Sequence, residues 1–338
     1  MAAPPRPPAP RASTANVPDA AQFGDWSVAC DNIRYCEILA ADGNTRALTL
    51  YVSRMAPGTA QPIVKVQRSF GDGTPSAAYI EIDGRRSDFA IDSEGNLIGP
   101  PAAFLAALAK ANSAQAIGRD GERLGAIPVM GASAALRWMD DRQKRADTVS
   151  AIVAKGTRPA NSVPPPPPLP EVVMPEMSDA PPQQLNAQDV RDIRAISDYC
   201  DDDREIFETY RLDAKHTVGL VFCFLAAYQG PDIVVVIDED GGWEPASIEQ
   251  PSHRAEFEPN SPWRYMLTTA DYNSEDRLLT FWSKGRGLAD CGSSGSWAWD
   301  GEVFRLTAWQ ELDPCRGAPP GLWLSRWQTA NDPLDRSQ

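Results

Sequence analysis

Residues 297–309 read Trp-Ala-Trp-Asp-Gly-Glu-Val-Phe-Arg-Leu-Thr-Ala-Trp, and this stretch indicates how the second half of the chain folds. Two runs rich in aromatic residues, 297–299 and 304–309, flank Asp300-Gly301, a dipeptide typical of the tight turn between antiparallel strands. We therefore predict a β-hairpin. Because side chains two residues apart lie on the same face of a strand, Trp297 and Trp299 should share one face.

Short apolar runs of the same kind continue on the N-terminal and C-terminal sides of this hairpin. Turns that contain Gly or Asp separate them, and the β-branched run Val234-Val235-Val236 is typical of a strand buried on both faces. About eight short strands favour an antiparallel sandwich or a partly closed barrel. Besides the hairpin, the pattern predicts a helix over 185–199 and strands over 206–212, 217–228, 232–237, 264–269, 277–282 and 322–327.

The first half of the chain starts with strands and then changes to helices. Ala-rich segments at 100–112 and 132–144 predict two short helices, and the polar residues 140–145 should form a solvated end of the second one. The fold class is therefore mainly β, between all-β and α+β, with two sandwich- or barrel-like domains, the first carrying the helices. Strands are predicted over 23–30, 48–54, 63–70 and 78–82, and a hairpin over 114–129 around Asp120-Gly121.

A proline-rich segment divides the two halves. Residues 164–168 are five consecutive prolines, and such a run adopts polyproline II, a semi-rigid spacer of about 3 Å per residue. A ligand for a proline-recognising domain is the alternative interpretation. A chain of 338 residues suggests two domains. The predicted organisation is a disordered segment over 1–19, a first domain over 20–158, a linker over 159–184, a second domain over 185–330 and a tail over 331–338.

The six cysteines fall into three close pairs with long gaps between them. Pairing of neighbours gives the simplest set of disulfides, because each bridge then stays within one domain. Buried free thiols are an alternative, whereas zinc is disfavoured because no C-x-x-C spacing occurs and the chain has only two histidines. Disulfides imply an oxidising compartment. The cysteines predicted to form them are Cys30, Cys36, Cys200, Cys223, Cys291 and Cys315.

The beginning of the chain and its hydropathy bear on location. Residues 1–10 lack the apolar stretch of a signal peptide, so the chain is interpreted as a mature form whose signal was removed, with a cytoplasmic protein as the alternative. No run approaches the roughly 20 apolar residues of a membrane span. Together with the cysteines, these features predict a periplasmic or secreted protein without a membrane span.

Charge is distributed unevenly between the two halves. Residues 1–163 hold 18 Lys and Arg against 16 Asp and Glu, whereas residues 164–338 hold 14 against 30, which gives −14 for the whole chain. An acidic second half repels phosphate groups, which argues against nucleic acid and anionic lipid as partners. Cations, basic proteins and neutral ligands remain as candidates.

Several motifs resemble known families. The opening Trp26-Ser27-Val28-Ala29-Cys30, the helical segment Phe104 to Ala109 and the later Gly131-Ala132-Ser133 resemble the invasion-associated locus B family of exported proteins over roughly residues 20–155. Met139-Asp140-Asp141, the junction at Gly156, Asp290-Cys291-Gly292 and Trp297-x-Trp299-Asp300-Gly301 resemble an uncharacterised bacterial family catalogued as domain of unknown function 1176. This resemblance implies an exported envelope protein and supplies no activity and no catalytic residues.

The tryptophans and one Gly-rich loop are candidate ligand-binding residues. Exposed Trp297, Trp299 and Trp323 could stack on sugar rings of an envelope glycan, and Arg286 lies in a loop of small residues that could form a ligand rim. The alternative interpretation places these tryptophans in the core beside Cys291 and Cys315.

Metal binding and catalysis have weaker support. Asp271, Asn273 and Glu275 offer alternating oxygen ligands for calcium, although Asp and Asn also cap turns, and further acidic groups lie at 201–203 and 238–240. Apart from calcium, no cofactor is expected. A serine or cysteine nucleophile would need His216 or His253 as its base, and no Gly-x-Ser-x-Gly motif occurs. Paired carboxylates could still hydrolyse a glycan.

These observations favour a non-catalytic periplasmic or envelope protein that binds a protein or glycan partner. The first alternative is a hydrolase that acts on envelope glycan through paired carboxylates. The second is a calcium-stabilised structural module.

Overall fold

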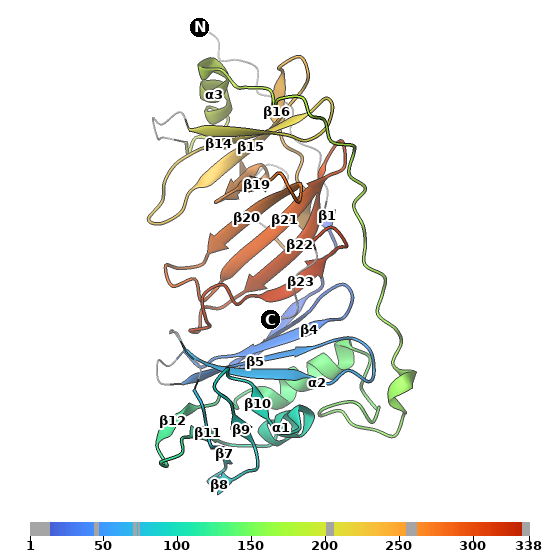
Figure 1. Ribbon diagram of the computed structural model, residues 1–338, viewed down its shortest axis with the longest axis vertical. Helices are drawn as coiled ribbons and strands as arrows, with labels where there is room; N and C mark the ends of the chain where they lie inside the picture. The colour runs from blue at the N-terminus through green and yellow to red at the C-terminus, as the bar shows by residue number, and fades with distance from the viewer. Residues whose placement is uncertain are drawn as a thin grey trace.

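The structure of the protein is a computed structural model that describes residues 14–43, 47–69, 73, 75–200, 206–254 and 262–332. Figure 1 shows an elongated stack of β-sheets with helices near both ends. The chain is mainly β, with three α-helices among the described residues, which confirms the predicted fold class. In the same residues, no helix combines the length and the apolar character that crossing a membrane requires.

The first domain is built on a five-stranded antiparallel sheet in which consecutive strands pair in chain order. Short connections make this meander the simplest arrangement for strands that alternate apolar and polar residues. Its strands are β2 (Ala20–Phe23), β3 (Trp26–Cys30), β4 (Cys36–Ala40), β5 (Leu48–Arg54) and β6 (Ile63–Arg68). A smaller sheet has the order β12-β11-β7-β8 and contains β7 (Tyr79–Ile82), β8 (Arg85–Arg86), β11 (Ala114–Ile117) and β12 (Arg123–Ala126). A separate pair consists of β9 (Ala90–Ile91) and β10 (Leu97–Ile98).

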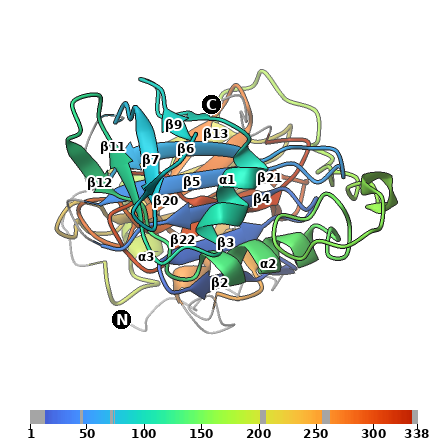
Figure 2. The same ribbon diagram turned by 90° about the horizontal axis from the view of Figure 1, so that it is seen from below.

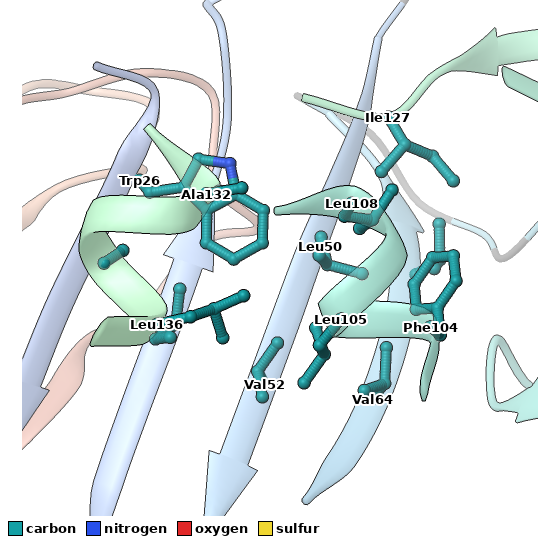
Figure 3. Close-up of a cluster of buried hydrophobic side chains, with 14 of the residues drawn as sticks. Trp26, Leu50, Val52, Val64, Phe104, Leu105, Leu108, Ile127, Ala132 and Leu136 are labelled. Carbon is teal, nitrogen blue, oxygen red and sulfur yellow. The ribbon is translucent and has the colours of Figure 1, made fainter. Parts of the chain in front are cut away.

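The two helices predicted for the first domain are present, and they cover one face of the five-stranded sheet. They are α1 (Pro101–Leu108) and α2 (Ala132–Arg142), which lie side by side in Figure 2. Pro101 stands in the first turn of α1, where its missing N–H costs no hydrogen bond. Figure 3 shows the core between these helices and the strands, formed by Trp26, Leu50, Phe104, Leu105, Leu108 and Leu136 among others.

The second domain is a sandwich of two five-stranded sheets, neither closed into a barrel. The outer sheet contains β13 (Phe207–Arg211), β14 (Thr217–Phe222), β15 (Pro231–Ile237), β16 (Trp243–Pro245) and β18 (Met266–Thr268). The inner sheet contains β19 (Asp271–Asn273), β20 (Leu278–Lys284), β21 (Gly292–Trp299), β22 (Phe304–Leu312) and β23 (Leu324–Gln328). The hairpin predicted at 297–309 is the turn between β21 and β22. Helix α3 (Ala187–Arg194) packs on the outer sheet, and Asn186 caps it.

The two domains pack against each other through their central sheets. Ala29 and Leu39 of the first domain share a buried cluster with Leu312, Trp323 and Leu324 of the second. Polar contacts accompany it, since Asn32 and Gln328 exchange two hydrogen bonds of 2.9 Å. We call this junction the seam.

The proline-rich linker is docked along the side of the molecule (Figure 1). Arg34 of the first domain donates to the carbonyls of Pro164 and Pro165, and Arg277 of the second donates to Pro175 at 2.7 Å. Asn331 exchanges two hydrogen bonds with Val172. The extended conformation agrees with polyproline II, but the contacts make the segment a strap. A free spacer would lack such contacts.

The N-terminal segment is also more ordered than expected. Within the segment predicted to be disordered over 1–19, β1 (Thr14–Ala15) pairs in parallel with β17 (Gln250–Pro251), and Val17 is buried. The apolar side chains of Ala15 and Val17 join the core of the sandwich, which explains the difference. Residues 1–13 of this prediction, and 333–338 of the predicted tail, lie outside the described residues.

Candidate functional site

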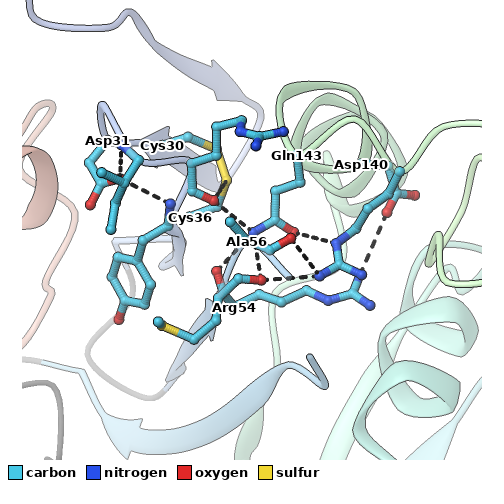
Figure 4. The surroundings of a disulfide bond; sticks show 12 residues. Cys30, Asp31, Cys36, Arg54, Ala56, Asp140 and Gln143 are labelled. Atoms are coloured by element: carbon cyan, nitrogen blue, oxygen red, sulfur yellow. Dashed lines mark hydrogen bonds and ion pairs between the residues drawn. A yellow bond between two sulfur atoms is a disulfide. The ribbon is translucent and has the colours of Figure 1, made fainter. Parts of the chain in front are cut away.

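All six cysteines are bridged to their neighbours, which confirms the predicted pairing. Cys30–Cys36 closes the turn between β3 and β4 (Figure 4). Cys200–Cys223 ties the segment after α3 to the end of β14, and Cys291–Cys315 joins the chain before β21 to the chain after β22. None of the six is available as a nucleophile or as a thiolate ligand.

The polar end of α2 is solvated only in part: Asp141, Arg142 and Lys144 are exposed as predicted for 140–145, whereas Asp140, Gln143 and Arg145 are buried, which corrects the prediction for these three. The Asp140 carboxylate accepts hydrogen bonds from the main-chain N–H groups of Ile152, Val153 and Ala154 at 2.8–3.0 Å. Arg145 donates to the carbonyls of residues 55–58 and to Gln143. The polar sequence of 140–145 is typical of an exposed helix end, but polar side chains can be buried where hydrogen bonds within the protein satisfy them, as they do here.

The same network lowers the pKa of two arginines. Burial, with Arg145 nearby, lowers the pKa of Arg54 to about 9, and burial lowers the pKa of Arg145 to about 10, while Asp140 opposes both shifts. Gln143 links these groups to the carbonyl of Arg54 at 2.8 Å (Figure 4). Because Arg145 and Asp140 are fully enclosed, we assign the network to holding loops together.

The tryptophans predicted to stack on a ligand lie in the core, so that prediction is corrected. Trp297, Trp299 and Trp323 are each at most 4% exposed. Trp297 and Trp299 do share a face, but this face points to the outer sheet and contributes to the sandwich core. Their indole N–H groups are satisfied inside, by Glu249 O at 2.7 Å and by the Asp213 carboxylate at 2.8 Å. Buried rings cannot reach a sugar.

Arg286 shapes the loop between β20 and β21. Its guanidinium contacts the buried Asp290 carboxylate, with Nε 2.7 Å from Oδ1, and Gly317 N donates to the same carboxylate at 2.7 Å. Burial raises the pKa of Asp290, but these hydrogen bonds outweigh it and hold the pKa below its usual value. Arg286 therefore positions the rim and is itself part of a fixed ion pair.

The predicted calcium ligands form a turn. Asn273 Oδ1 accepts from Glu275 N at 2.8 Å and from Asp276 N at 3.2 Å, and Asp271 accepts from Tyr272 N. Calcium binding there stays a prediction, and the acidic residues 201–203 lie outside the described residues. Within the part of the chain that the structure describes, the one cluster of three possible metal ligands is Asp290, Cys291 and Cys315, whose two sulfurs form a disulfide.

The two histidines lie far apart in the sandwich and pair with carboxylates. His216 Nδ1 lies 2.9 Å from the Asp213 carboxylate, and its ring contacts Trp299 edge-on. Burial raises the pKa of Asp213, but hydrogen bonds from His216, Lys215 N and Trp299 together hold it below its usual value. His253 Nε2 lies 2.7 Å from Glu311.

Two adjoining pockets meet at the end of β22, and Glu311, Leu312 and Asp313 line both. We call the two together the β22 groove. The first, the loop pocket, has a volume of about 340 Å³ and is also lined by Arg254, Ser283, Lys284, Gly285, Cys291, Gly292, Ser293 and Cys315. The second, the seam pocket, has a volume of about 250 Å³ and is also lined by Ala20, Ala21, Gln22, Ser27, Val28, Leu324 and Arg326.

Local backbone conformation opens the loop pocket. Gly292 has φ +149°, and a Cβ there would lie 2.2 Å from Ser283 O and 2.7 Å from the Trp323 ring. Only glycine fits such a position. The motif Asp290-Cys291-Gly292 thus builds this wall of the groove through an ion pair, a disulfide and a close backbone contact.

Glu311 is the electrostatic centre of the groove. It lies 2.7 Å from His253, 2.8 Å from Arg326 and 3.5 Å from Arg254. Burial raises the pKa of Glu311, but the hydrogen bond and charge of His253, with the charges of both arginines, outweigh it and lower the pKa to about 2. Glu311 is therefore an anion that holds two guanidinium groups at the groove.

Lys284 extends the positive charge to the rim. Its Nζ lies 5.2 Å from the centroid of the Tyr228 ring and 5.1 Å from that of Trp282, and Trp282 stacks on Trp323. Tyr228 is 47% exposed. The groove thus places Arg254, Lys284 and Arg326 against two carboxylates, inside a domain with a large excess of acids.

Sequence reasoning missed most of these residues. Lys284 directly precedes the Gly285-Arg286-Gly287 loop, which the sequence suggested as a ligand rim. A cation at this position could have been predicted to belong to the same rim. The sequence does not indicate the seam pocket, because its walls come from residues about 290 positions apart that meet only when the domains pack.

Comparison with known proteins gives a family but no activity. The "Uncharacterized protein YpfG" of Escherichia coli (strain K12) is 28% identical over 331 residues, which is 90% of this chain and 92% of that protein. No solved structure matches the chain. The similarity to the invasion-associated locus B family stays a prediction. The model of the family described as "Protein of unknown function (DUF1176)" matches residues 20–330, so the chain belongs to this family, as its motifs predicted.

Proposed function

We propose that the protein is a non-catalytic periplasmic or envelope protein that binds a protein or glycan partner at the β22 groove. The observation that carries this proposal is the gathering of Arg254, Lys284 and Arg326 in one groove of a domain that is otherwise strongly acidic. Acidic surroundings repel anions elsewhere, so the groove is where an anionic group of a partner gains most. Three disulfides support an oxidising compartment.

The groove is tested by capture of partners from a solubilised envelope extract. The full chain is compared with Lys284→Glu, which reverses the charge at the rim, and with the matched control Lys215→Glu, at an exposed position on the β13–β14 turn. We expect Lys284→Glu to reduce capture at least about tenfold and Lys215→Glu to leave it unchanged. Equal capture by all three proteins would remove the groove from the proposal.

The location is tested by counting thiols on the purified protein in denaturant. No thiol before reduction and six after it are expected for a protein from an oxidising compartment. Several thiols before reduction would contradict the proposed location.

One observation supports the hydrolase as a second candidate. Burial raises the pKa of Asp232 to about 7, and the charge of Glu208 adds to the shift, while a hydrogen bond from Ala270 N opposes it. A general acid needs such a pKa near the working pH. Turnover of muropeptides that disappears in Asp232→Asn would favour the hydrolase, and no turnover by the unmodified protein would exclude it.

A further inference from the structure

The two pockets of the β22 groove are lined by different parts of the molecule. The loop pocket belongs to the second domain alone, whereas β2 and β3 of the first domain form one wall of the seam pocket. Because Glu311, Leu312 and Asp313 line both, a ligand that occupies one pocket meets the other directly. A ligand in the seam pocket contacts both domains, and an elongated ligand can also reach the loop pocket.

The seam pocket is lined by an edge strand, β2, together with Ser27 and Val28 of its neighbour β3. β2 stands at the end of the strand order, and among the described residues it pairs with β3 alone. The consecutive residues Ala20, Ala21 and Gln22 line the pocket, so the strand borders it along its length. An edge strand carries main-chain N–H and C=O groups that an added extended peptide can pair with.

The chemistry of the lining favours a peptide over a glycan. Neither pocket is lined by an aromatic side chain, although stacking on an open aromatic face is how sugar rings are commonly held. Among the rings beside the pockets, Trp309 is fully buried, and Trp282 lies between Lys284 and the stacked ring of Trp323. The apolar residues that line the seam pocket are small or branched instead, and Val28, Leu312 and Leu324 among them are buried.

The loop pocket supplies what the end of a peptide needs. Lys284 and Arg254 are cations in its wall, and Arg254 is held there by Ser293 at 3.2 Å and by Glu311. A carboxylate in the pocket would meet both cations, and capture of a C-terminal carboxylate is a recurring mode of peptide recognition.

We propose that the β22 groove binds an extended peptide that adds to the edge of β2 and ends in a free C-terminal carboxylate beside Lys284. This inference rests on the proposed function and deepens it, because it selects the class of partner and assigns a role to each domain. The positive loop pocket sets the direction of the peptide, and the apolar residues of the seam pocket favour apolar side chains farther from the carboxylate.

The test uses synthetic peptide pools as the probe and the full chain as the receptor. One pool contains random hexapeptides with a free C-terminus, a second the same peptides as C-terminal amides, and a third random tripeptides with a free C-terminus. Bound peptides are separated by rapid gel filtration and counted by mass spectrometry. Lys284→Gln removes the proposed contact, and Lys215→Gln is the matched control at an exposed site.

We expect the free hexapeptides to be retained at least about tenfold more than the amides, with the difference lost in Lys284→Gln and kept in Lys215→Gln. Tripeptides should be retained about tenfold less than hexapeptides, because they cannot span both pockets. With the most enriched hexapeptide at saturation, hydrogen exchange of the main-chain amides of β2 should slow, which a peptide confined to the loop pocket would not cause.

Other outcomes separate this inference from the proposed function. Equal retention of acids and amides, or no slowing at β2, overturns the peptide geometry while binding at the groove stands. Retention of purified glycan strands but not of peptides, sensitive to Lys284→Gln, overturns the peptide and keeps the proposed function. Retention of neither probe, together with no capture from the envelope extract, overturns both.

Discussion

Ser325 of β23 donates its main-chain N–H to the carboxylate of Glu37 on β4, at 2.6 Å, across the seam between the two domains. The hydroxyls of Tyr35 and Tyr51 donate to the same carboxylate from within the first domain. Burial and the charge of Glu37 together raise the pKa of Tyr51, so this phenol stays a donor. A single buried carboxylate thus collects donors from both domains.

Replacing this carboxylate should loosen the seam. Glu37→Ala leaves Ser325 N and two phenols without their acceptor, so we expect the free energy of unfolding to fall by about 2–4 kcal/mol. Urea denaturation followed by Trp fluorescence measures the change. Glu122→Ala, at an exposed position of the β11–β12 turn, is the control and should stay within about 0.5 kcal/mol. An equal effect of both variants would contradict the coupling.

Arg145 should be among the positions where substitution costs most stability. Arg145→Ala removes the donor to the carbonyls of Ala56 and Gly58, while Met55 keeps Gln143 and Pro57 keeps Ala60 N as donors. Each unsatisfied buried acceptor costs about 1–3 kcal/mol, and the cavity left by the side chain adds to the loss. We expect a loss of at least about 3 kcal/mol in urea denaturation. The nearby Arg142→Ala, at an exposed position of α2, should cost less than about 1 kcal/mol. Comparable losses in the two variants would show that the buried contacts are not the cause.

Asp232 should make the protein less stable as the pH rises towards neutrality. Its pKa is about 7 in the folded protein against 3.8 as the reference, so the folded state holds the proton more tightly. The stabilisation that this bound proton gives to the folded state is fully present below about pH 4 and is lost as the pH rises through about 7. Asp232→Asn should remove this loss and stabilise the protein at pH 8, by up to about 4 kcal/mol. Urea denaturation at several pH values measures this stability difference, and the exposed Asp240→Asn is the control. Parallel pH profiles of stability for the unmodified protein and Asp232→Asn would show that the raised pKa of Asp232 is not the cause.

Glu311 should make the protein more stable as the pH rises, over a lower pH range than Asp232. Its pKa is about 2 in the folded protein against 4.5 as the reference, so its ionised form stabilises the fold above about pH 4.5. This contribution disappears as the pH falls through about 2. Glu311→Gln should therefore cost about 3 kcal/mol at pH 7 and little at pH 2. The exposed Glu244→Gln should show no such pH dependence, and a cost for Glu311→Gln that does not vary with pH would count against the ion cluster.

The sequence specifies local structure well, because local structure follows from local patterns. The turn at Asp300-Gly301, the helix that starts near Pro101 and the three neighbouring disulfides were all predicted. The alternation of Trp297 and Trp299 correctly gave a shared face. It could not say whether that face meets water or another sheet, since a period of two is the same in both cases.

Features that depend on distant partners escaped prediction. Asp140 and Arg145 look like surface charges until the loops at 152–154 and 55–58 close over them. The β22 groove depends on how the two central sheets dock. Nothing near Gln22 in the sequence reveals that Arg326 will lie in the same pocket.

The docked strap has a consequence for the covalent topology of the molecule. The seam already holds the halves together through apolar and polar contacts, and the strap follows their side without crossing between them. The covalent connection through residues 164–182 therefore mainly raises the effective concentration of one domain near the other. It contributes little to how the two domains are arranged at the seam. We therefore expect a chain cut within the strap to stay together as two polypeptides that the seam holds in the same arrangement.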